Sequence, residues 1–584
     1  MRRVWLALFA LAAIWAAALV HRGAAVAPDE IEFFRATRWI GEGKVPFRDF
    51  WEHHTPLQWI VFAPVARLFA NGAGVESIVA MRWAQLALWI ALFVLLARLA
   101  RRERVAIWPA LVLLLASATF VRRAVEYRVD VPGNLAYLAA VALVAFGATP
   151  LRWIGFGALM SAAVLANMRL APLVVFTALL ALFWRSEERR WRWNARALWM
   201  APGVAIVAAA FVGYLALTGA WTKFLDSILR YNVASATLLE VDTFFDAFLL
   251  PLWALDAAGT AFWSAAVAGV ILALRRIRTP GPLQFLALLA IASVATVAAM
   301  EVQYDYHFQG AWLLLLPLVA LALDRMRAHW QAVAALIAAT SLAIFVMQVV
   351  PAFGVKSDYQ DEVMTTVDRV TQPGETVFDG AGFALRREPA YRYWFLTTGV
   401  RMMAERRLIE PYDAREMAAQ PPAAIVADYR LRVYLREFPR LARYATMHYV
   451  PLFRDLWVPG MSALAGPRPE RLLWVAPRAG KFDVYASTAL ATHPWLTNPL
   501  AYAEVRGGHA PGYAIPLRQL PALPGEALQW TIDGVPQPHG VRTLTLRKGS
   551  KVELIARPER RAGILLVPHG VQTLALAPAD PFVF

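Results

Sequence analysis

Two neighbouring carboxylates, Asp29 and Glu30, stand where a first apolar run gives way to a polar segment of the chain. A carboxylate in such a place can act as a general base toward a hydroxyl group. The same residues also suit the start of a helix, with Asp29 as the N-cap and with Glu30 and Glu32 in the first turn. Spacing alone favours the helix start, so the catalytic interpretation depends on what gathers nearby.

A second acidic group, Glu126, Arg128 and Asp130, falls between two later apolar runs. Asp130 stands at the mouth of a run, where an unpaired carboxylate is costly. Several cationic side chains are expected on the same side of the membrane as both acidic groups: His53, His54, Arg122, Arg123, Arg169 and His307. This arrangement suits a base that acts on an acceptor hydroxyl while the cations hold a phosphate.

Residues 21–78 form an unusually long connection between two apolar runs, and this connection brings acids, bases and aromatic residues together. It should therefore have a structure of its own. Apolar spacing predicts two amphipathic helices in it, Ile31 to Ile40 and Leu57 to Phe69, the second too short to cross a bilayer comfortably. We expect both helices to lie flat at the outer interface.

Composition explains why a membrane is expected. Hydrophobic residues make up 59% of the 584 residues and charged residues only 17%, a balance typical of a chain dissolved in lipid. About eleven apolar runs are long enough to form membrane-spanning helices. They cover residues 4–20, 79–97, 105–120, 131–147, 153–168, 170–184, 197–217, 257–274, 282–300, 310–323 and 331–350.

The first run could also be a cleavable signal peptide, because Ala25-Val26-Ala27 resembles a small-residue cleavage site. Pro28 follows directly and argues against cleavage, so the run is taken as the first spanning helix.

Charge sets the expected orientation. Arginine-rich stretches at 101–104 and 275–278 favour the cytoplasmic side. Segments 21–78, 121–130, 218–256 and 301–309 would then lie outside, and an odd number of crossings would put residues 351–584 there too. We therefore expect a multi-pass protein of the cell (inner) membrane, with its site and its C-terminal region on the outer, periplasmic side.

The remaining composition excludes other classes. The net charge of +16 arises mainly from Lys and Arg at the ends of apolar runs, which argues against binding to nucleic acid. With no cysteine, the chain has no disulfide, thiolate metal site or cysteine nucleophile.

Arg169 is almost all that separates the fifth apolar run from the sixth. One long tilted helix with a snorkelling arginine is one interpretation. Two short helices that turn near the outer face would let both basic flanks, Arg152 and residues 185–196, reach the cytoplasm. We favour the two short helices for that reason.

After residue 350 the pattern changes to short interrupted runs. Residues 351–465 are expected to form a mixed α/β domain, with buried strands near 376–378 and 424–427 and a helix near 435–444. Residues 466–584 are expected to form a small β-sandwich, with strands near 544–546, 552–555 and 564–567. Neither shows a nucleophile elbow, phosphate loop or metal spacing, so acceptor binding or packing over the active site is their expected role.

Pro28-Asp29-Glu30, with Gly43 to Asp49 and Phe50 to Leu57, resembles the first outer loop of the GT-C superfamily of membrane glycosyltransferases. The nearest branch uses dolichyl- or polyprenyl-phosphate sugars and includes protein O-mannosyltransferases and the lipid A aminoarabinose transferase. The order of elements also matches over residues 1–350, which would form the transmembrane catalytic module. The resemblance implies an α-helical polytopic membrane fold with the soluble α/β lobe and β-sandwich appended.

The resemblance assigns roles to particular residues. Asp29 corresponds to the proposed catalytic base, with Glu30 beside it, and Asp130 to the acid of the second loop. Arg169 corresponds by position to a basic residue associated with the donor phosphate, usually Lys in the family, and His307 to one that precedes the tenth span. His53 and His54 complete the predicted phosphate-binding set.

The implied reaction moves a sugar from a polyprenyl-phosphate donor to an acceptor hydroxyl, with inversion at the anomeric carbon. Asp29 would take the hydroxyl proton while Arg169 and His54 stabilise the departing phosphate. The acceptor stays open among a lipid, a glycan and a protein. A divalent metal held by Glu30 and Asp130 is a further option, although two carboxylates are a small ligand set.

Two functions from other classes fit parts of the sequence. In a lipid or glycan transporter or flippase, Arg169 and Asp130 would mark a translocation path, but the runs show no inverted repeat. In a noncatalytic envelope scaffold that displays the β-sandwich, the carboxylates of the first loop would be dispensable.

Overall fold

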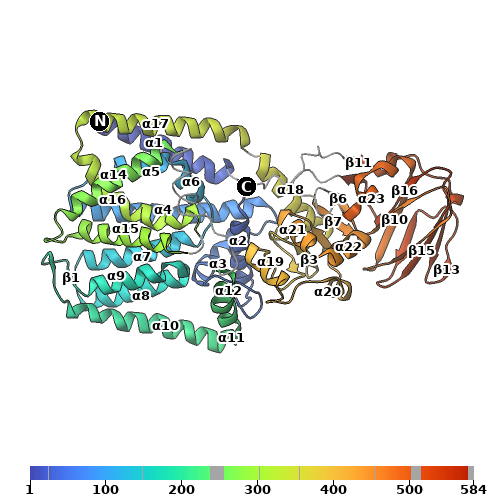
Figure 1. Ribbon diagram of the computed structural model, residues 1–584, viewed down its shortest axis with the longest axis horizontal. Helices are drawn as coiled ribbons and strands as arrows, with labels where there is room; N and C mark the ends of the chain where they lie inside the picture. The colour runs from blue at the N-terminus through green and yellow to red at the C-terminus, as the bar shows by residue number, and fades with distance from the viewer. Residues whose placement is uncertain are drawn as a thin grey trace. The chain divides into compact units, whose positions relative to one another are not determined.

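The structure, a computed structural model, describes residues 1–23, 25–147, 149–236, 256–300, 303–353, 355–453, 455–500 and 514–575. Parts of the predicted outer segments 218–256 and 301–309, and of the predicted domains 351–465 and 466–584, lie outside these residues. The chain divides into two compact units, Met1–Asp358 and Tyr359–Phe584. Figure 1 shows helices throughout the first unit and mixed helices and strands in the second.

Six helices of the first unit, counted with the short turns that extend them, are long and apolar enough to cross a membrane. They make this a multi-pass membrane protein. Their cores are α1 (Arg2–Ala18), α4 (Val75–Arg102), α10 (Met200–Leu217), α14 (Ala257–Leu274), α16 (Gln309–Arg325) and α17 (Ala328–Val349).

Five shorter helices fall on the other predicted runs. They are α5 (Trp108–Ala116), α7 (Asp130–Ala145), α8 (Pro150–Ala166), α9 (Ala171–Ala181) and α15 (Pro282–Ala298). Every predicted run thus contains a helix, while the number of crossings stays a prediction.

The run predicted at 105–120 is not one continuous helix. It breaks after α5, where Ser117 caps a second short helix, α6 (Ala118–Ala124), by accepting a hydrogen bond from the backbone N–H of Phe120. The Ser117 hydroxyl also lies 2.5 Å from a carboxylate oxygen of Asp256, at the start of α14. This buried pairing explains the break, because a polar cap and its partner replace the helix ladder there.

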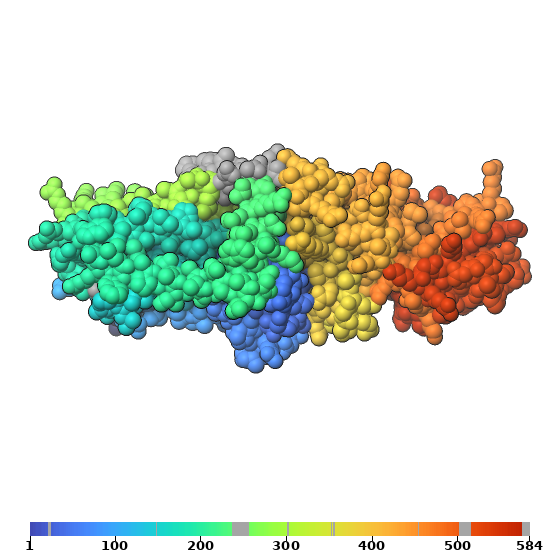
Figure 2. Space-filling model, turned by 90° about the horizontal axis from the view of Figure 1, so that it is seen from below, coloured from blue at the N-terminus to red at the C-terminus, as the bar shows by residue number. Residues whose placement is uncertain are grey.

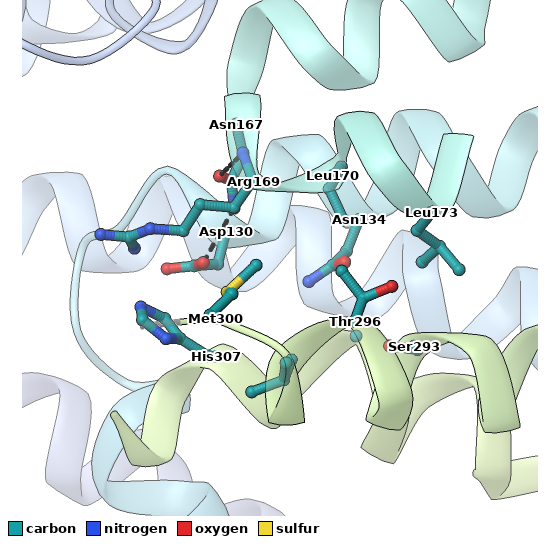
Figure 3. Close-up of a pocket in the computed structure, with 12 residues that line it drawn as sticks. Asp130, Asn134, Asn167, Arg169, Leu170, Leu173, Ser293, Thr296, Met300 and His307 are labelled. Carbon is teal, nitrogen blue, oxygen red and sulfur yellow. Dashed lines mark hydrogen bonds between the residues drawn. The ribbon is translucent and has the colours of Figure 1, made fainter. Parts of the chain in front are cut away.

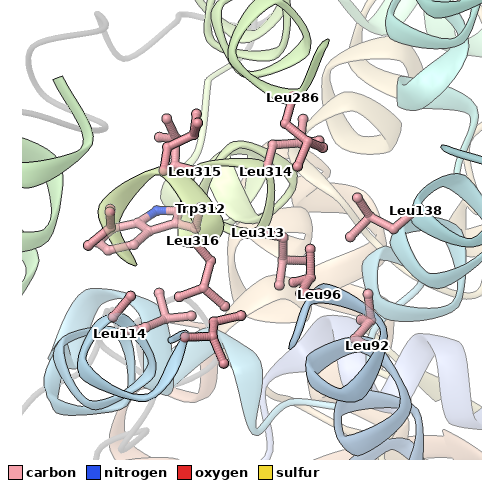
Figure 4. Close-up of a cluster of buried hydrophobic side chains, with 14 of the residues drawn as sticks. Leu92, Leu96, Leu114, Leu138, Leu286, Trp312, Leu313, Leu314, Leu315 and Leu316 are labelled. Atoms are coloured by element: carbon pink, nitrogen blue, oxygen red, sulfur yellow. The ribbon is translucent and has the colours of Figure 1, made fainter. Parts of the chain in front are cut away.

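A leucine-rich core joins the helices of the first unit (Figure 4). Helix α16 lies at its centre, since 78% of the residues in its most apolar stretch are buried. The labelled side chains come from α4, α5, α7, α15 and α16: Leu92, Leu96, Leu114, Leu138, Leu286, Trp312, Leu313, Leu314, Leu315 and Leu316. A helix that is apolar on all sides and enclosed by others is a scaffold element.

Helix α10 has the opposite character. Only 11% of the residues in its most apolar stretch are buried, and Val204, Ile206 and Val212 are exposed. The teal and green segments that include it form much of the face of the first unit in Figure 2. Exposed apolar side chains in such numbers suit contact with lipid.

Glycines let α10 approach α8 closely. A Cβ atom on Gly203 would lie 2.0 Å from the carbonyl oxygen of Ile154, and one on Gly157 would lie 2.0 Å from that of Met200. Small residues at helix crossings are typical of membrane bundles, because they let the backbones pack directly.

The second unit contains a five-stranded sheet of order β4-β3-β5-β7-β6, in which β4 is Glu388–Pro389, β6 is Tyr449–Phe453 and β7 is Leu456–Pro459. Strands β3 (Thr376–Asp379) and β5 (Ala424–Val426) are parallel and buried, as the apolar runs there predicted. The predicted helix at 435–444 is wrong in its bounds: α21 (Tyr429–Glu437) ends before Pro439, which starts α22 (Pro439–His448). The proline forces this division, since it cannot continue a helix from the preceding turn.

Two four-stranded antiparallel sheets follow, of order β14-β10-β16-β8 and β13-β12-β15-β9. Their inner faces share one apolar core that contains Phe482, Trp530 and Leu554. Strand β8 (Met461–Ala465) pairs with β16 (Ala562–Pro568), so the sandwich takes in residues before 466. The other strands are β9 (Glu470–Val475), β10 (Gly480–Ser487), β12 (Leu528–Ile532), β13 (Val535–Pro536), β14 (Thr543–Leu546) and β15 (Lys551–Ala556).

Candidate active site

The helix that carries the first acidic pair is α2, Pro28–Gly41. Pro28 occupies its first turn and Ala27 is the N-cap, so the N-cap interpretation of Asp29 is wrong. Asp29 lies inside the first turn, where a carboxylate faces the positive end of the helix dipole. Glu30 instead caps the helix, because its Oε2 accepts a hydrogen bond from the Ala27 backbone N–H at 2.9 Å.

Arg128 joins the two predicted acidic groups. Its Nη1 lies 3.2 Å from Asp29 Oδ2 and 3.0 Å from Glu126 Oε2. Its Nε lies 3.2 Å from Asp130 Oδ2. Three carboxylates from two separate stretches of backbone, α2 and residues 126–130, therefore share one buried guanidinium.

The acidic group extends outward from Arg128 through further ion pairs. Glu126 also pairs with Arg123 at 2.9 Å, and Arg123 pairs with Asp305 at 3.0 Å. Burial raises the pKa of Glu126, although Arg123 and Arg128 act in the opposite direction. Glu126 consequently links Arg128 to a second cation at the edge of the group.

Tyr306 supplies an aromatic wall to these cations. Its ring is buried and lies 3.8 Å from the Arg128 guanidinium and 5.6 Å from that of Arg169. Cations over an aromatic face are stabilised by the ring quadrupole. The ring therefore lies close to both the arginine of the acidic group and the arginine of the predicted phosphate site.

Arg169 lies between two separate helices, as the basic flanks predicted. Helix α8 ends at Ala166, a single 3₁₀ turn covers Met168–Leu170, and α9 begins at Ala171. The interpretation as one long helix is thus excluded. Asn167 starts this turn by accepting a hydrogen bond from the Arg169 N–H, and its Nδ2 donates to Asp130 Oδ1 at 2.9 Å.

A small polar pocket opens beside this turn (Figure 3). Its volume of ≈ 30 Å³ has room for one or two water molecules. Asp130, Arg169 and His307 line one part of it, and Asn134, Ser293 and Thr296 line another. The pocket therefore brings hydrogen-bond donors and acceptors together beside Arg169 and His307, two of the residues predicted to bind a phosphate.

His53 and His54 belong to a different cluster. The Nδ1 of His54 lies 3.1 Å from Glu52 Oε1, and the Nδ1 of His53 lies 3.3 Å from Glu32 Oε1. Burial and the neighbouring His53 lower the pKa of His54 to about 4. Burial would raise the pKa of Glu52, but the two neighbouring histidines outweigh it and lower that pKa to about 2.

Glu30, the second carboxylate of the first pair, is held in place by buried hydrogen bonds. Both oxygens of Glu30 accept hydrogen bonds from Arg82, at 2.7 and 2.6 Å, and Oε1 also accepts one from the Tyr127 N–H at 2.8 Å. Both side chains are almost fully buried. Glu30 therefore holds α2 against α4 and against the loop that contains Tyr127.

The fold has relatives among solved structures. ArnT from Cupriavidus metallidurans in the apo state aligns with 78% of this chain and 97% of its own, at a TM-score of 0.53 and 16% identity. The structure of the same protein bound to undecaprenyl phosphate gives 18% identity with the same coverage and TM-score. This chain has the fold of ArnT. The likeness extends to the fold expected from the resemblance, and it concerns the fold alone.

More distant likenesses add nothing to this. The oligosaccharyltransferase of Archaeoglobus fulgidus aligns with 76% of this chain and 72% of its own, at 13% identity and a TM-score of only 0.36. No protein-family model and no curated protein matches the sequence.

Several side chains that the structure places in or beside the candidate site were not singled out from the sequence: Glu52, Arg82, Asn134, Asn167 and Tyr306. Glu52 had a usable signal, since it directly precedes two histidines. Arg82 had none, because an arginine near the start of an apolar run also suits an interfacial anchor.

Proposed function

We propose that this chain is a glycosyltransferase that moves a sugar from a polyprenyl-phosphate donor to an acceptor hydroxyl at the outer face of the cell (inner) membrane. The observation that carries the proposal is the position of Asp29. Its side chain is 32% exposed while the Arg128 that holds it is 2% exposed. Asp29 is thus a fixed carboxylate with one side open to an incoming group, as a general base needs to be.

Asp29 would accept the proton of the acceptor hydroxyl. The acceptor oxygen forms a bond to the anomeric carbon, and the bond from that carbon to the phosphate oxygen breaks with its electron pair on oxygen. Attack from the opposite face inverts the anomeric centre. The products are the glycosylated acceptor and the polyprenyl phosphate.

The leaving phosphate gains one negative charge in this step, since a diester becomes a monoester. Arg169 is the proposed partner of that charge, because it lines the pocket beside Asp130 and its planar guanidinium suits two phosphate oxygens. His307 lines the same pocket and is a second proposed contact. The fold supports such a donor, since ArnT has been solved with undecaprenyl phosphate bound.

A matched pair of variants tests the proposal. Wild type, Asp29→Asn and Asp49→Asn are purified in detergent and mixed with radiolabelled polyprenyl-phosphate sugars and an envelope extract that supplies lipid, glycan and protein acceptors. Asp49 is the control because it belongs to the same loop and pairs only with its exposed neighbour Arg48 and a backbone N–H among the described residues.

Label transfer by wild type and Asp49→Asn, with none by a folded Asp29→Asn protein, would support the enzyme and name its donor. Equal transfer by all three would remove Asp29 as the base. No transfer by any of them across a broad donor panel would favour a transporter or a scaffold.

A further inference from the structure

The cluster of Glu32, Glu52, His53 and His54 has the chemistry and the geometry of a metal site. One ligand atom from each residue can be chosen so that all four lie within 4.8 Å of one another. Two imidazoles and two carboxylates are a donor set typical of zinc and of neighbouring transition-metal ions. The proposed transfer reaction assigns no role to any of these four residues.

Three of the distances between donor atoms are close to those of a single tetrahedral ion, and a fourth is longer. An ion about 2.1 Å from each donor requires donors separated by about 3.4 Å. From Nδ1 of His53 the distances are 3.3 Å to Glu32 Oε1 and 3.4 Å to Glu52 Oε1. From Nδ1 of His54 they are 3.1 Å to Glu52 Oε1 and 3.9 Å to Glu32 Oε1.

Some of the oxygen and nitrogen atoms that could bind a metal have no hydrogen-bond partner among the described residues. Glu52 is fully buried, and its Oε2 has no hydrogen-bond partner among the described residues. The Nδ1 of His53 also has none there, because its short approaches to the two glutamates lack hydrogen-bond geometry. A buried carboxylate left with an unpaired oxygen is costly, and a cation bound to that carboxylate would compensate its charge.

The surroundings favour a rigid, enclosed site. Trp51 stacks on His53 with ring centroids 5.2 Å apart, and Phe33 lies edge-on to His54 at 5.1 Å. Asn232 donates a hydrogen bond to the His53 backbone carbonyl at 3.0 Å. Aromatic and polar contacts of this kind fix the orientation of ligand side chains.

We propose that Glu32, Glu52, His53 and His54 bind one divalent cation of the zinc class. The ion would join α2, which supplies Glu32, to the segment that supplies the other three ligands. It would therefore stabilise the helix that carries Asp29 without contacting the reacting groups. The proposal stands whether or not the transfer reaction is correct.

Metal content of the full-length protein tests this directly. The protein is purified in detergent through a tag that does not bind metals, stripped with a chelator, reloaded with Zn²⁺ and desalted. We expect about one zinc ion per chain and a higher melting temperature after reloading. Glu52→Gln and His54→Gln should each weaken zinc binding by on the order of 100-fold or more.

Two control variants keep the result specific. Glu42 is an exposed carboxylate at the end of α2, and His329 is an exposed histidine at the start of α17. Glu42→Gln and His329→Gln should bind zinc like wild type. Equal zinc retention by wild type and by both ligand variants would overturn the proposal.

X-ray absorption at the zinc edge of the wild type covers the case in which the ligand variants do not fold. Two imidazole ligands with oxygen neighbours at about 2.0–2.1 Å are the expected spectrum. A site with only oxygen neighbours, or a wild type that takes up no zinc after stripping, would refute it.

Discussion

The Nη1 atom of Arg128 lies 3.2 Å from the Oδ2 atom of Asp29. Residues 99 positions apart in the chain are thus joined across two loops that were predicted to lie outside. Because Arg128 also contacts Glu126 and Asp130, its charge is shared among three carboxylates. In the proposed reaction Arg128 would accordingly position Asp29 rather than meet the substrate.

Replacing Arg128 with methionine should remove the contact that joins Asp29 to Glu126 and Asp130. Three buried or half-buried carboxylates would then face one another without their common cation, at a cost of about 3–5 kcal/mol in stability. We expect a lower melting temperature and a pH profile of kcat/KM whose acidic limb moves to higher pH, since repulsion would favour protonated Asp29. Arg48→Met is the control, as Arg48 forms an exposed pair, and it should leave both readouts unchanged. An unchanged pH profile in a folded Arg128→Met protein would count against the positioning role.

Arg82→Met should destabilise the protein by about 3–5 kcal/mol, because it leaves the Glu30 carboxylate buried without its counter-ion. Adding Glu30→Gln to the same chain removes that charge and should restore most of the loss. Thermal melting of wild type, both single variants and the double variant forms a double-mutant cycle that measures the pair. If the double variant melts no higher than Arg82→Met alone, the ion pair is not the reason for the loss.

Gly203→Ala should lower the melting temperature, whereas Gly213→Ala on the same helix should not. The added methyl group would lie 2.0 Å from the Ile154 carbonyl oxygen at Gly203, but it would meet nothing within 4 Å at Gly213. Overpacking of this kind costs about 1–3 kcal/mol. Equal melting of the two variants would show that α8 and α10 separate freely.

Stability of the second unit should fall as the pH rises through about 6. Burial, followed by the nearby Asp379, raises the pKa of Asp428 from 3.8 to about 6 in the folded state. The folded chain therefore binds a proton more tightly than the unfolded chain, and this contribution is full below pH ~4 and lost above pH ~6. A shift of that size corresponds to about 3 kcal/mol.

Pulse proteolysis of the full chain between pH 4 and 8, scored on fragments of residues 359–584, measures this loss. In Asp379→Asn the neighbouring charge is absent, so the midpoint of the loss should move to lower pH. A midpoint that stays in place would show that Asp379 does not act on Asp428.

Local patterns predicted what depends on local causes. The positions of α2 and α3 (Leu57–Phe69) follow from apolar spacing, and the division around Arg169 follows from the need of both basic flanks for the same side. That Asp29, Asp130 and Arg169 gather near one another also follows from the order of runs, because alternate ends of membrane helices must lie together.

Pairings between distant residues could not be predicted in this way. Nothing in the sequence around Arg82 identifies Glu30 as its partner, because that choice depends on how α4 crosses α2. The same holds for His53 and His54: their charge suggested a phosphate, whereas the fold turns their Nδ1 atoms toward Glu32 and Glu52. The predicted phosphate contacts and the predicted metal ligands Glu30 and Asp130 remain predictions, and the structure pairs both carboxylates with arginines.

The short length of α9 has a consequence for the membrane itself. Eleven residues of helix extend about 16 Å, roughly half of the ~30 Å hydrocarbon thickness. Such hydrophobic mismatch is relieved when the leaflet thins locally around the short helix. Lipid headgroups would then lie closer to Arg169. A lipid phosphate could reach Arg169 from the side while the lipid tail stays among the acyl chains. The thickness of the bilayer would thus affect how easily a lipid phosphate enters the site.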